Sequence, residues 1–144
     1  MREADALRAM KPRHILFLCV ANSGRSQIAE GIARTLAPSG VKISSAGSEP
    51  EPVSPYSIRV LDEVGIDISS HRSKGVEAID ATSVDAVVTL CAEESCPVFF
   101  GKAHRVHWGL ADPAHAPPDE PSQLAAYRAV RDELLVRLRR LFEG

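Results

Sequence analysis

The sequence predicts an α/β fold, in which a parallel β-sheet carries helices on both faces. Residues 14–20 (HILFLCV) and 84–90 (VDAVVTL) form nearly continuous apolar runs, typical of strands that are buried on both faces of a parallel sheet. Helical patterns separate these runs, and strands that alternate with helices imply right-handed crossovers between parallel strands. The chain has 144 residues, of which 44% are hydrophobic, so a single domain over residues 1–144 can bury a core.

The first half of the chain contains two strands and a helix. Residues 1–12 mix acidic and basic side chains, and we expect a frayed or weakly helical N-terminal extension there. The first apolar run is the first strand. The following helix is predicted from Ile28, Ile32 and Leu36, which are four residues apart and therefore share one face. Residues 41–45 are expected to form a short second strand.

The second half begins with another helix. Ser54 and Pro55 have the residue types of an N-cap and a first helical position, and Gly65 ends the helix. The second apolar run is the third strand, and residues 104–107 form a short fourth strand. A long amphipathic helix closes the chain. Its apolar positions are Leu124, Tyr127, Val130, Leu134, Leu138 and Leu141.

Composition narrows the classes of function. A net charge of -2 gives no electrostatic reason to expect nucleic acid or an anionic membrane as a partner. The longest apolar run, residues 15–21, is too short to span a bilayer, and the N-terminus lacks the apolar middle of a signal peptide. We therefore expect a cytoplasmic protein whose three cysteines are kept reduced. Cysteines in that compartment are more often catalytic, redox-active or metal-binding than structural.

A Cys-x5-Arg motif lies where the first strand meets the following helix. Unpaired N–H groups and the helix dipole favour an anion at a helix N-terminus, and successive loop N–H groups can surround a tetrahedral oxyanion. Arg25 supplies a planar guanidinium that binds two oxygens at once. The same positive field favours the thiolate of Cys19, which predicts a nucleophile. The expected oxyanion-binding loop consists of Val20, Ala21, Asn22, Ser23, Gly24, Arg25 and Ser26.

The alternative interpretation of Cys19 is a small buried core residue at a strand end. The polar segment Ser-Gly-Arg-Ser, which follows a few residues later, is unlike a core segment and favours the catalytic interpretation.

Several segments, in order, resemble the low-molecular-weight protein tyrosine phosphatase family and, within it, the thioredoxin-coupled arsenate reductases. They are CVANSGRSQIAEG, SSAGSEP, VGIDISSHRSK, VVTLC and HWGLADPA. The likeness as a whole extends over about residues 13–142. The resemblance implies a three-layer fold with a four-stranded parallel sheet in the order 2-1-3-4. It also implies that Asn22 and Ser26 hydrogen-bond the loop and the Cys19 thiolate.

The implied strand order places two cysteines at one edge of the sheet. Cys19 and Cys91 follow strands 1 and 3, which become neighbours, so their Cα atoms can approach the separation of a disulfide. The resemblance implies a redox disulfide between Cys91 and Cys96. Four residues separate these two cysteines, whereas well-known reductases of the family have six. The shorter loop does not forbid the disulfide.

Two other interpretations of Cys91 and Cys96 remain open. With His104 and His107 they form a pattern similar to a zinc site. However, residues three apart on a strand point to opposite faces, so we expect no metal. The second alternative is that both thiols are inert. The polar composition of the loop and the resemblance favour thiol exchange.

Asp112 precedes Pro113 just after the fourth predicted strand, at the same edge of the sheet. A carboxyl group there can act as the general acid that protonates the departing oxygen, although an Asp-Pro pair is also a common turn initiator. His71 and Arg72 are expected near the rim of the site, where a structural role is at least as plausible as a catalytic one.

Some reductases of this family hold a potassium ion through an acidic residue and through positions that match Asn22, Glu30 and Ser45. Lys74 occupies the position of that acid, and its ammonium group can take the place of the cation. We therefore expect no bound potassium and no cofactor.

The resemblance implies that the chain reduces arsenate to arsenite by a relay through Cys19, Cys91 and Cys96, with thioredoxin as the reductant. We also expect a monomer. The alternative is a low-molecular-weight protein tyrosine phosphatase or a hydrolase of small phosphate esters, because the same chemistry serves both. A tyrosine phosphatase needs aromatic walls. The sequence has Ala114 after the Asp-Pro pair, no aromatic residue in SSAGSEP and only Trp108 nearby, which favours the reductase.

Overall fold

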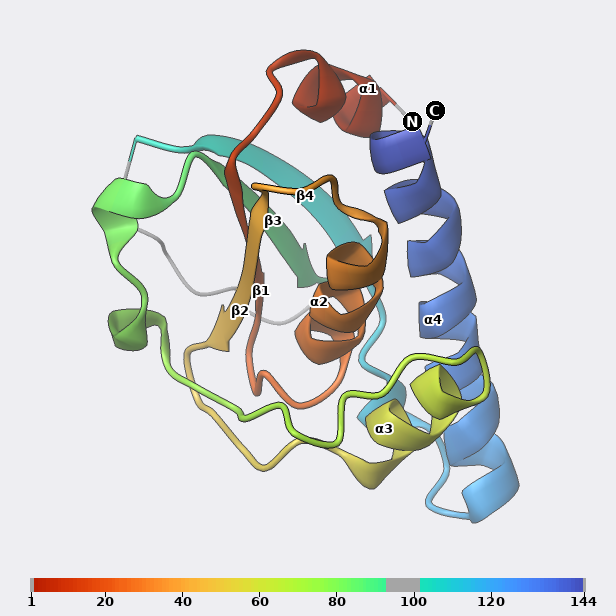
Figure 1. Ribbon diagram of the computed structural model, residues 1–144. Helices are drawn as coiled ribbons and strands as arrows, with labels where there is room; N and C mark the ends of the chain where they lie inside the picture. The colour runs from red at the N-terminus through yellow and green to blue at the C-terminus, as the bar shows by residue number, and fades with distance from the viewer. Residues whose placement is uncertain (1, 93–101, 144) are drawn as a thin grey trace.

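Four parallel strands form the sheet of the computed structural model, which describes residues 2–92 and 102–143 (Figure 1). The strands lie in the order β2-β1-β3-β4, and every neighbouring pair is parallel. The predicted parallel sheet and its strand order are therefore confirmed. The strands are β1 (His14–Cys19), β2 (Lys42–Gly47), β3 (Ala86–Cys91) and β4 (His104–Leu110).

Both faces of β1 are buried, which explains its continuous apolar run. Ile15 and Phe17 point into the larger hydrophobic core, whereas Leu16 and Leu18 point into a smaller core on the other face. A central strand of a parallel sheet alternates its side chains between two covered faces, so neither set can be polar.

Helices cover both faces of the sheet. α2 (Arg25–Leu36), α3 (Pro55–Asp62) and α4 (Glu120–Glu143) supply the larger core, and Figure 1 shows α4 running beside α2 and α3. In the described part of the other face, the short 3-10 helices η1 (Val76–Ala78) and η2 (Ala81–Ser83) adjoin the smaller core. No helix within residues 2–92 and 102–143 is both long enough and apolar enough to cross a bilayer.

The start of α3 agrees with the sequence, whereas the predicted ends of α3 and β4 do not: α3 ends at Asp62, before Gly65. Ser54 caps α3 and Pro55 is its first residue, as predicted. β4 continues to Leu110, past the predicted end at residue 107. The reason is that β4 keeps pairing with β3 as far as Cys91, across an irregularity in the register.

The N-terminal segment forms the helix α1 (Arg2–Ala9), where we expected a frayed or weakly helical extension. Ala4 and Leu7 are fully buried and belong to the larger core. Arg140 of α4 donates two hydrogen bonds, of 2.8 and 2.9 Å, to the carboxylate of Asp5. The three-residue spacing of Ala4 and Leu7 puts both on the inner face, so α1 packs against α4 (Figure 1).

Candidate active site

β1 carries Cys19 to the carboxyl edge of the sheet, where the chain turns into α2. Cys19 is a free thiol and is 2% exposed. Its Sγ lies 2.9 Å from Oγ of Ser26, in the first turn of α2. A hydroxyl at this distance stabilises a thiolate by a charge-assisted hydrogen bond. The structure thus brings together the predicted nucleophile and its predicted hydrogen-bond partner.

Asn22 fixes the shape of the loop that follows Cys19. Its backbone has a left-handed φ of +49°, a conformation that asparagine tolerates better than most residues. Its Nδ2 donates to Oγ of Ser26 at 2.7 Å and to Oγ of Ser45, on β2, at 2.9 Å. Its Oδ1 accepts from the backbone N–H of Lys74 at 2.9 Å. Asn22 therefore ties the loop to β2 and to the chain near Lys74.

The carbonyl groups of the loop are held on its outer side by the connection between β2 and α3. The donor–acceptor pairs are Glu49 N to Val20 O at 2.9 Å, Glu51 N to Ala21 O at 2.9 Å and Ser54 N to Ser23 O at 3.0 Å. In a trans peptide the N–H group points opposite to the C=O group. The N–H groups of these peptides are thus turned toward the inner side, as an oxyanion cradle requires.

Arg25, the first residue of α2, is 3% exposed and lies between the strand ends and the predicted acid. Its Nη1 donates to the carbonyl of Leu110 at 2.8 Å and lies 3.5 Å from the carbonyl of Leu90. Its Nη2 is 3.8 Å from the Asp112 carboxylate. Arg25 and Asp112, far apart in sequence, therefore meet beside the loop, as the sequence predicted.

Asp112 lies two residues after β4, at the start of the short 3-10 helix η3 (Pro113–His115). Its Oδ1 accepts a hydrogen bond from the N–H of Ala114 at 3.0 Å, which makes Asp112 the N-cap of η3. Its Oδ2 is 3.6 Å from Nε2 of the exposed His115. The turn expected from the Asp-Pro pair is thus real, and it also orients the carboxylate toward Arg25.

β3 carries the second predicted thiol to the same edge of the sheet. Leu18 pairs with Thr89 of β3, so Cys19 and Cys91 end neighbouring strands. Cys91 is buried and disulfide-bonded, whereas Cys19 is a free thiol. The predicted third thiol, Cys96, lies outside the described residues.

A buried carboxylate lies behind the loop. Glu30 is 3% exposed and accepts a hydrogen bond from Oγ of Ser45. Arg34 pairs with Glu30 at 2.8 Å, and Nζ of Lys74 is 3.7 Å from its Oε1. A buried charge needs such compensation. The positions that we compared with a potassium site, Asn22, Glu30, Ser45 and Lys74, thus belong to one hydrogen-bonded and ionic network.

Gln27 is a structural contributor that the sequence analysis missed. Its Nε2 donates to Oδ1 of Asn22 at 3.1 Å and to the carbonyl of Arg72 at 3.0 Å, and its Oε1 is 3.0 Å from Nδ1 of His71. Burial lowers the pKa of His71, while the nearby Glu30 opposes the shift. His71 and Arg72 therefore support the loop through Gln27. The one sign of this role in the sequence was the position of Gln27, a polar residue directly beside the apolar face of α2.

The aromatic residues are arranged differently from the prediction. Trp108 is 2% exposed in the larger core, with Arg137 5.7 Å from its ring centroid, and so it forms no wall of the site. Tyr127, predicted only as a core position, borders the loop: a Cβ at Gly24 would lie 3.6 Å from its Cε1. Burial raises the pKa of Tyr127, and the charge of Asp112 adds to this shift.

The structure describes three of the four residues of the pattern similar to a zinc site, namely Cys91, His104 and His107. His107 on β4 has its Nδ1 2.6 Å from Oγ1 of Thr89. Among the residues that the structure describes, no three His, Cys, Asp or Glu side chains are grouped closely enough to hold a metal. Cys96, one member of the pattern, is outside that set.

The geometry is suited to covalent chemistry on a tetrahedral oxyanion. Cys19 supplies a buried sulfur beside a hydroxyl, and the loop N–H groups together with Arg25, at the start of α2, are donors that can stabilise an oxyanion. Asp112 places a carboxyl group next to Arg25, where it can act as general acid. Thus the residues predicted as nucleophile, anion-binding loop and proton donor lie in the same small region.

Known proteins are similar to this chain in sequence and in fold. The chain is 40% identical over 136 residues to an arsenate reductase of Bacillus subtilis, covering 93% of this chain and 98% of that protein. A structure of an arsenate reductase in the oxidised state superposes with a TM-score of 0.77 at 32% identity, over 91% of this chain and 97% of the other. A thioredoxin-dependent arsenate reductase of Corynebacterium glutamicum gives a TM-score of 0.68 at 27% identity, over 99% of this chain and 68% of the other.

The family assignment rests on most of the chain. Residues 14–144 match the family of low molecular weight phosphotyrosine protein phosphatases. The match contains the oxyanion loop, both described cysteines and Asp112. It begins after α1, which the family match does not include. The chain therefore belongs to the low molecular weight phosphotyrosine protein phosphatase family.

Proposed function

We propose that this protein reduces arsenate to arsenite by thiol chemistry. The observation that carries the proposal is that Cys19, beside an oxyanion loop, and Cys91 end neighbouring strands at one edge of the sheet. A phosphatase completes its cycle with water and has no use for a second thiol there. Similarity to proteins named arsenate reductase, at up to 40% identity over nearly the whole chain, supports the same reaction.

In the first step the Cys19 thiolate attacks the arsenic atom of bound arsenate. The loop N–H groups and Arg25 hold the arsenate oxygens and stabilise the charge that develops on them. Asp112 protonates the departing hydroxide, which leaves as water. The product is an arsenic(V) species joined to the Cys19 sulfur.

In the second step the Cys91 thiolate attacks Sγ of Cys19. The sulfur–arsenic bond breaks, its electron pair stays on arsenic, and arsenic(III) leaves as arsenite. The Cys19–Cys91 disulfide that remains is then attacked at Cys91 by Cys96. This exchange restores the Cys19 thiolate and leaves a Cys91–Cys96 disulfide. Each exchange requires an accessible thiolate.

An external dithiol protein, thioredoxin, would reduce the final disulfide and close the cycle. Support comes from the similarity to the thioredoxin-dependent enzyme of Corynebacterium glutamicum. The disulfide at Cys91 that leaves Cys19 free also fits the last intermediate of the relay.

The second candidate function is hydrolysis of an aryl phosphate, which the family assignment favours. The loop, Arg25 and Asp112 serve a phosphate ester as well as arsenate, because both ligands present a tetrahedral oxyanion. Tyr127 does not supply an open aromatic wall, because it is 3% exposed. The second thiol is therefore the feature that favours the reductase.

A comparison of two activities tests the proposal. Arsenate reduction driven by NADPH, thioredoxin reductase and thioredoxin is measured beside hydrolysis of p-nitrophenyl phosphate. We expect NADPH oxidation that depends on arsenate and saturates with it, with hydrolysis far slower. Rapid hydrolysis without arsenate-dependent NADPH oxidation would instead establish the phosphatase.

Two variants distinguish the roles of Cys96 and Cys19 in the reaction. Cys96→Ser should release about one arsenite per enzyme and then stop, because the first disulfide forms but cannot be passed on. Cys19→Ser should release none, because no arsenic–sulfur bond forms. Sustained turnover of Cys96→Ser with thioredoxin would remove the third thiol from the mechanism.

A further inference from the structure

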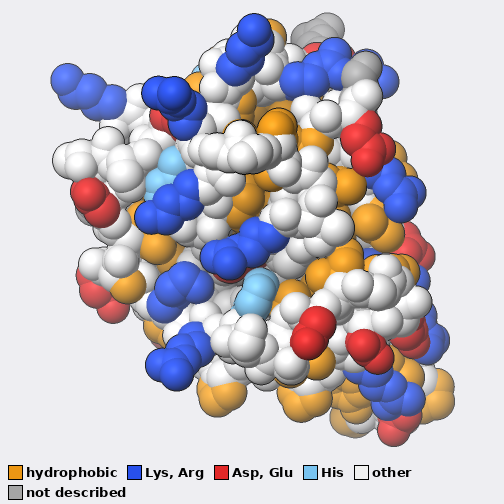
Figure 2. All heavy atoms as spheres, in the orientation of Figure 1, with side chains coloured by type: hydrophobic (Ala, Val, Ile, Leu, Met, Phe, Trp, Pro, Cys, Tyr) orange, Lys and Arg blue, Asp and Glu red, His pale blue; other side chains and the backbone are white. Residues whose placement is uncertain are grey.

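A cavity of about 430 Å³ lies at the amino edge of the sheet, opposite to the edge that carries Cys19. The α1–β1 connection, the α2–β2 connection and the end of α4 surround it. Figure 2 shows hydrophobic side chains at the surface below α1, with Lys and Arg side chains around them. Arg8 and residues 11–13, which line one side of the cavity, precede the family match, which begins at residue 14. The cavity is therefore separate from the oxyanion loop.

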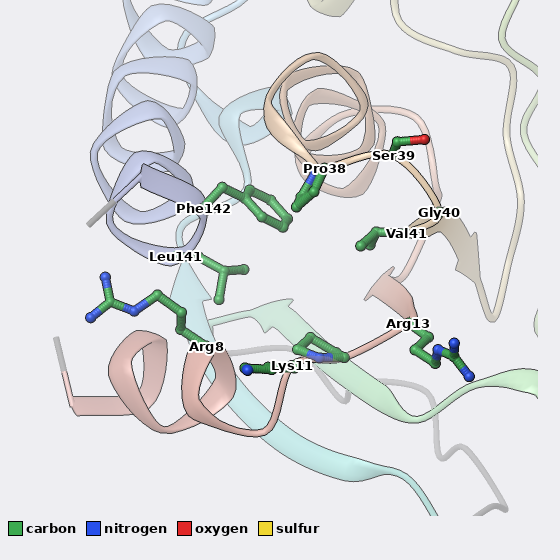
Figure 3. Close-up of a pocket in the computed structure, with 10 residues that line it drawn as sticks. Arg8, Lys11, Arg13, Pro38, Ser39, Gly40, Val41, Leu141 and Phe142 are labelled. Carbon is green, nitrogen blue, oxygen red and sulfur yellow. The ribbon is translucent and has the colours of Figure 1, made fainter.

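The inner surface of the cavity is apolar. Figure 3 shows the ring of Phe142 directed toward Pro38, with Leu141 below them and Val41 to one side. Leu141 is 2% exposed, so this wall is continuous with the larger core. Pro12, which also lines the cavity, is buried. An apolar wall built on core residues is a preformed surface for a hydrocarbon chain or ring.

The rim of the cavity is basic. Arg8, Lys11 and Arg13 line it, and Figure 3 places Lys11 between the two arginines. All three side chains are exposed, and the residues that line the cavity include no Asp or Glu. Within residues 2–92 and 102–143, none of the three has an ion pair.

Two carboxylates in this part of the molecule already have hydrogen-bond partners. Asp5 is bound by the guanidinium of Arg140 through two hydrogen bonds. Asp85 accepts hydrogen bonds from the backbone N–H groups of Arg13 and His14, at 2.9 Å each. The charge of Arg8 also acts on Asp5 and helps to lower its pKa, after the hydrogen bonds from Arg140. Lys11 and Arg13 have no ion pair among the described residues, so the complementary ligand carries a negative group beside these two.

We infer that this cavity binds a small monocarboxylate with a short apolar body. The volume lies at the lower end of ligand pockets, which span roughly 300–1,000 Å³, and suits one short hydrocarbon chain or one ring. The hydrocarbon would lie against Phe142 and Pro38, with the carboxylate at the rim beside Lys11 and Arg13. This inference does not depend on the proposed reductase activity, because the two sites lie at opposite edges of the sheet.

Calorimetric titration with octanoate and with 1-octanol tests the inference on the full chain. The two probes share one hydrocarbon chain and differ in the carboxylate. We expect saturable binding of octanoate and about tenfold weaker binding of octanol, since two or three exposed ion pairs each contribute modestly. Equal affinities, or no binding of octanoate, would overturn the inference.

Three variants locate the binding. The double variant Lys11→Gln, Arg13→Gln should weaken octanoate about tenfold and leave octanol unchanged. Arg139→Gln is the matched control, because Arg139 is exposed near the same end of α4 but does not line the cavity. Ser39→Trp, at the exposed rim, should fill the cavity and remove binding of both probes. Octanoate affinity that is unchanged in the double variant, or lowered equally by Arg139→Gln, would contradict the assignment.

Discussion

At the residue scale, two polar side chains determine how the sulfur of Cys19 is held. Asn22 donates to Oγ of Ser26 at 2.7 Å, and that same Oγ is 2.9 Å from the sulfur. The hydroxyl oxygen of Ser26 can accept from the amide and still donate its own hydrogen to the sulfur, because a hydroxyl has one O–H and two lone pairs. A hydroxyl that donates to an ionised sulfur forms a charge-assisted hydrogen bond, which is stronger than a bond between neutral groups.

Replacing Ser26 by Ala should therefore impair the chemistry more than the fold. A hydrogen bond to a charged group contributes about 1.5–3 kcal/mol, so kcat/KM for arsenate should fall about 10- to 100-fold. Steady-state kinetics with thioredoxin in excess measure this. Ser70→Ala, at an exposed position, is the control and should be unaffected. Wild-type kinetics in Ser26→Ala would show that the hydroxyl is dispensable.

The lysine beside Glu30 leads to a second prediction at this scale. Nζ of Lys74 lies 3.7 Å from the buried carboxylate, in the network that also contains Asn22 and Ser45. With a built-in cation there, the rate of arsenate reduction should be independent of potassium. Potassium chloride is exchanged for choline chloride at constant ionic strength, so that screening stays fixed. A large, saturable activation by potassium would refute the prediction.

At the element scale, the end of β2 supports the oxyanion loop by close approach of backbone to backbone. A Cβ at Gly47 would lie 2.3 Å from the carbonyl oxygen of Val20 and 2.9 Å from the N of Asn22. Only a residue without a side chain allows this contact. The β2–α3 connection, which begins here, then holds the carbonyls of the loop.

Gly47→Ala should push the loop away from β2 and spread its N–H groups. We expect a loss of about 1–3 kcal/mol in the free energy of unfolding, typical of overpacking, together with weaker phosphate binding. Urea unfolding and calorimetric titration with phosphate measure the two effects. Ser48→Ala, at the exposed neighbouring position, should change neither. Unchanged phosphate affinity in Gly47→Ala would show that the end of β2 does not determine the shape of the oxyanion loop.

His14 joins three elements at the opposite end of β1. Its Nε2 is 2.8 Å from Oγ of Ser44 on β2, and its Nδ1 is 3.1 Å from Oγ of Ser83 on η2. Burial lowers the pKa of His14 below its usual 6.5, and the charge of Lys42 adds to this shift. The unfolded chain therefore binds more protons than the folded one as the pH falls below about 6.5, so stability is lost on acidification.

This linkage predicts that the free energy of unfolding decreases between about pH 7.5 and pH 5.5, and that His14→Gln reduces the decrease. Part of the decrease should remain in His14→Gln, because the pKa of His71 is also lowered. Urea unfolding at both pH values measures the free energy of unfolding. His115→Gln is the control, since that side chain is 79% exposed and should keep the full decrease. If the free energy of unfolding decreases as much in His14→Gln as in the unchanged protein, His14 does not contribute to the pH dependence of stability.

The sequence predicted the elements and residues whose signals are local. Cys19 and Arg25 could be found because their spacing spans a strand-to-helix junction, and Ser54 because it precedes a proline at a helix start. Gln27 and Tyr127 could not be found in this way. An amide beside an apolar stripe, or a phenol within one, acquires its role only when distant elements pack against it.

At the scale of the whole molecule, the strand order is what brings the chemistry together. β1 and β3 are neighbours although β2, α2 and α3 separate them in the chain, so Cys19 and Cys91 reach one edge. The sequence could not supply this order without the resemblance, because the apolar runs of buried strands do not specify their neighbours. α1 adds Ala4 and Leu7 to the same core, and the basic cavity lies at the other edge.

The central claim is that oxidising equivalents pass from Cys19 to Cys91. The most direct test treats Cys96→Ser with arsenate for a single turnover, alkylates the remaining thiols and maps the disulfides by mass spectrometry. We predict a Cys19–Cys91 disulfide in an amount equal to the arsenite released. Release of arsenite while Cys19 and Cys91 are both recovered as alkylated thiols would contradict the relay.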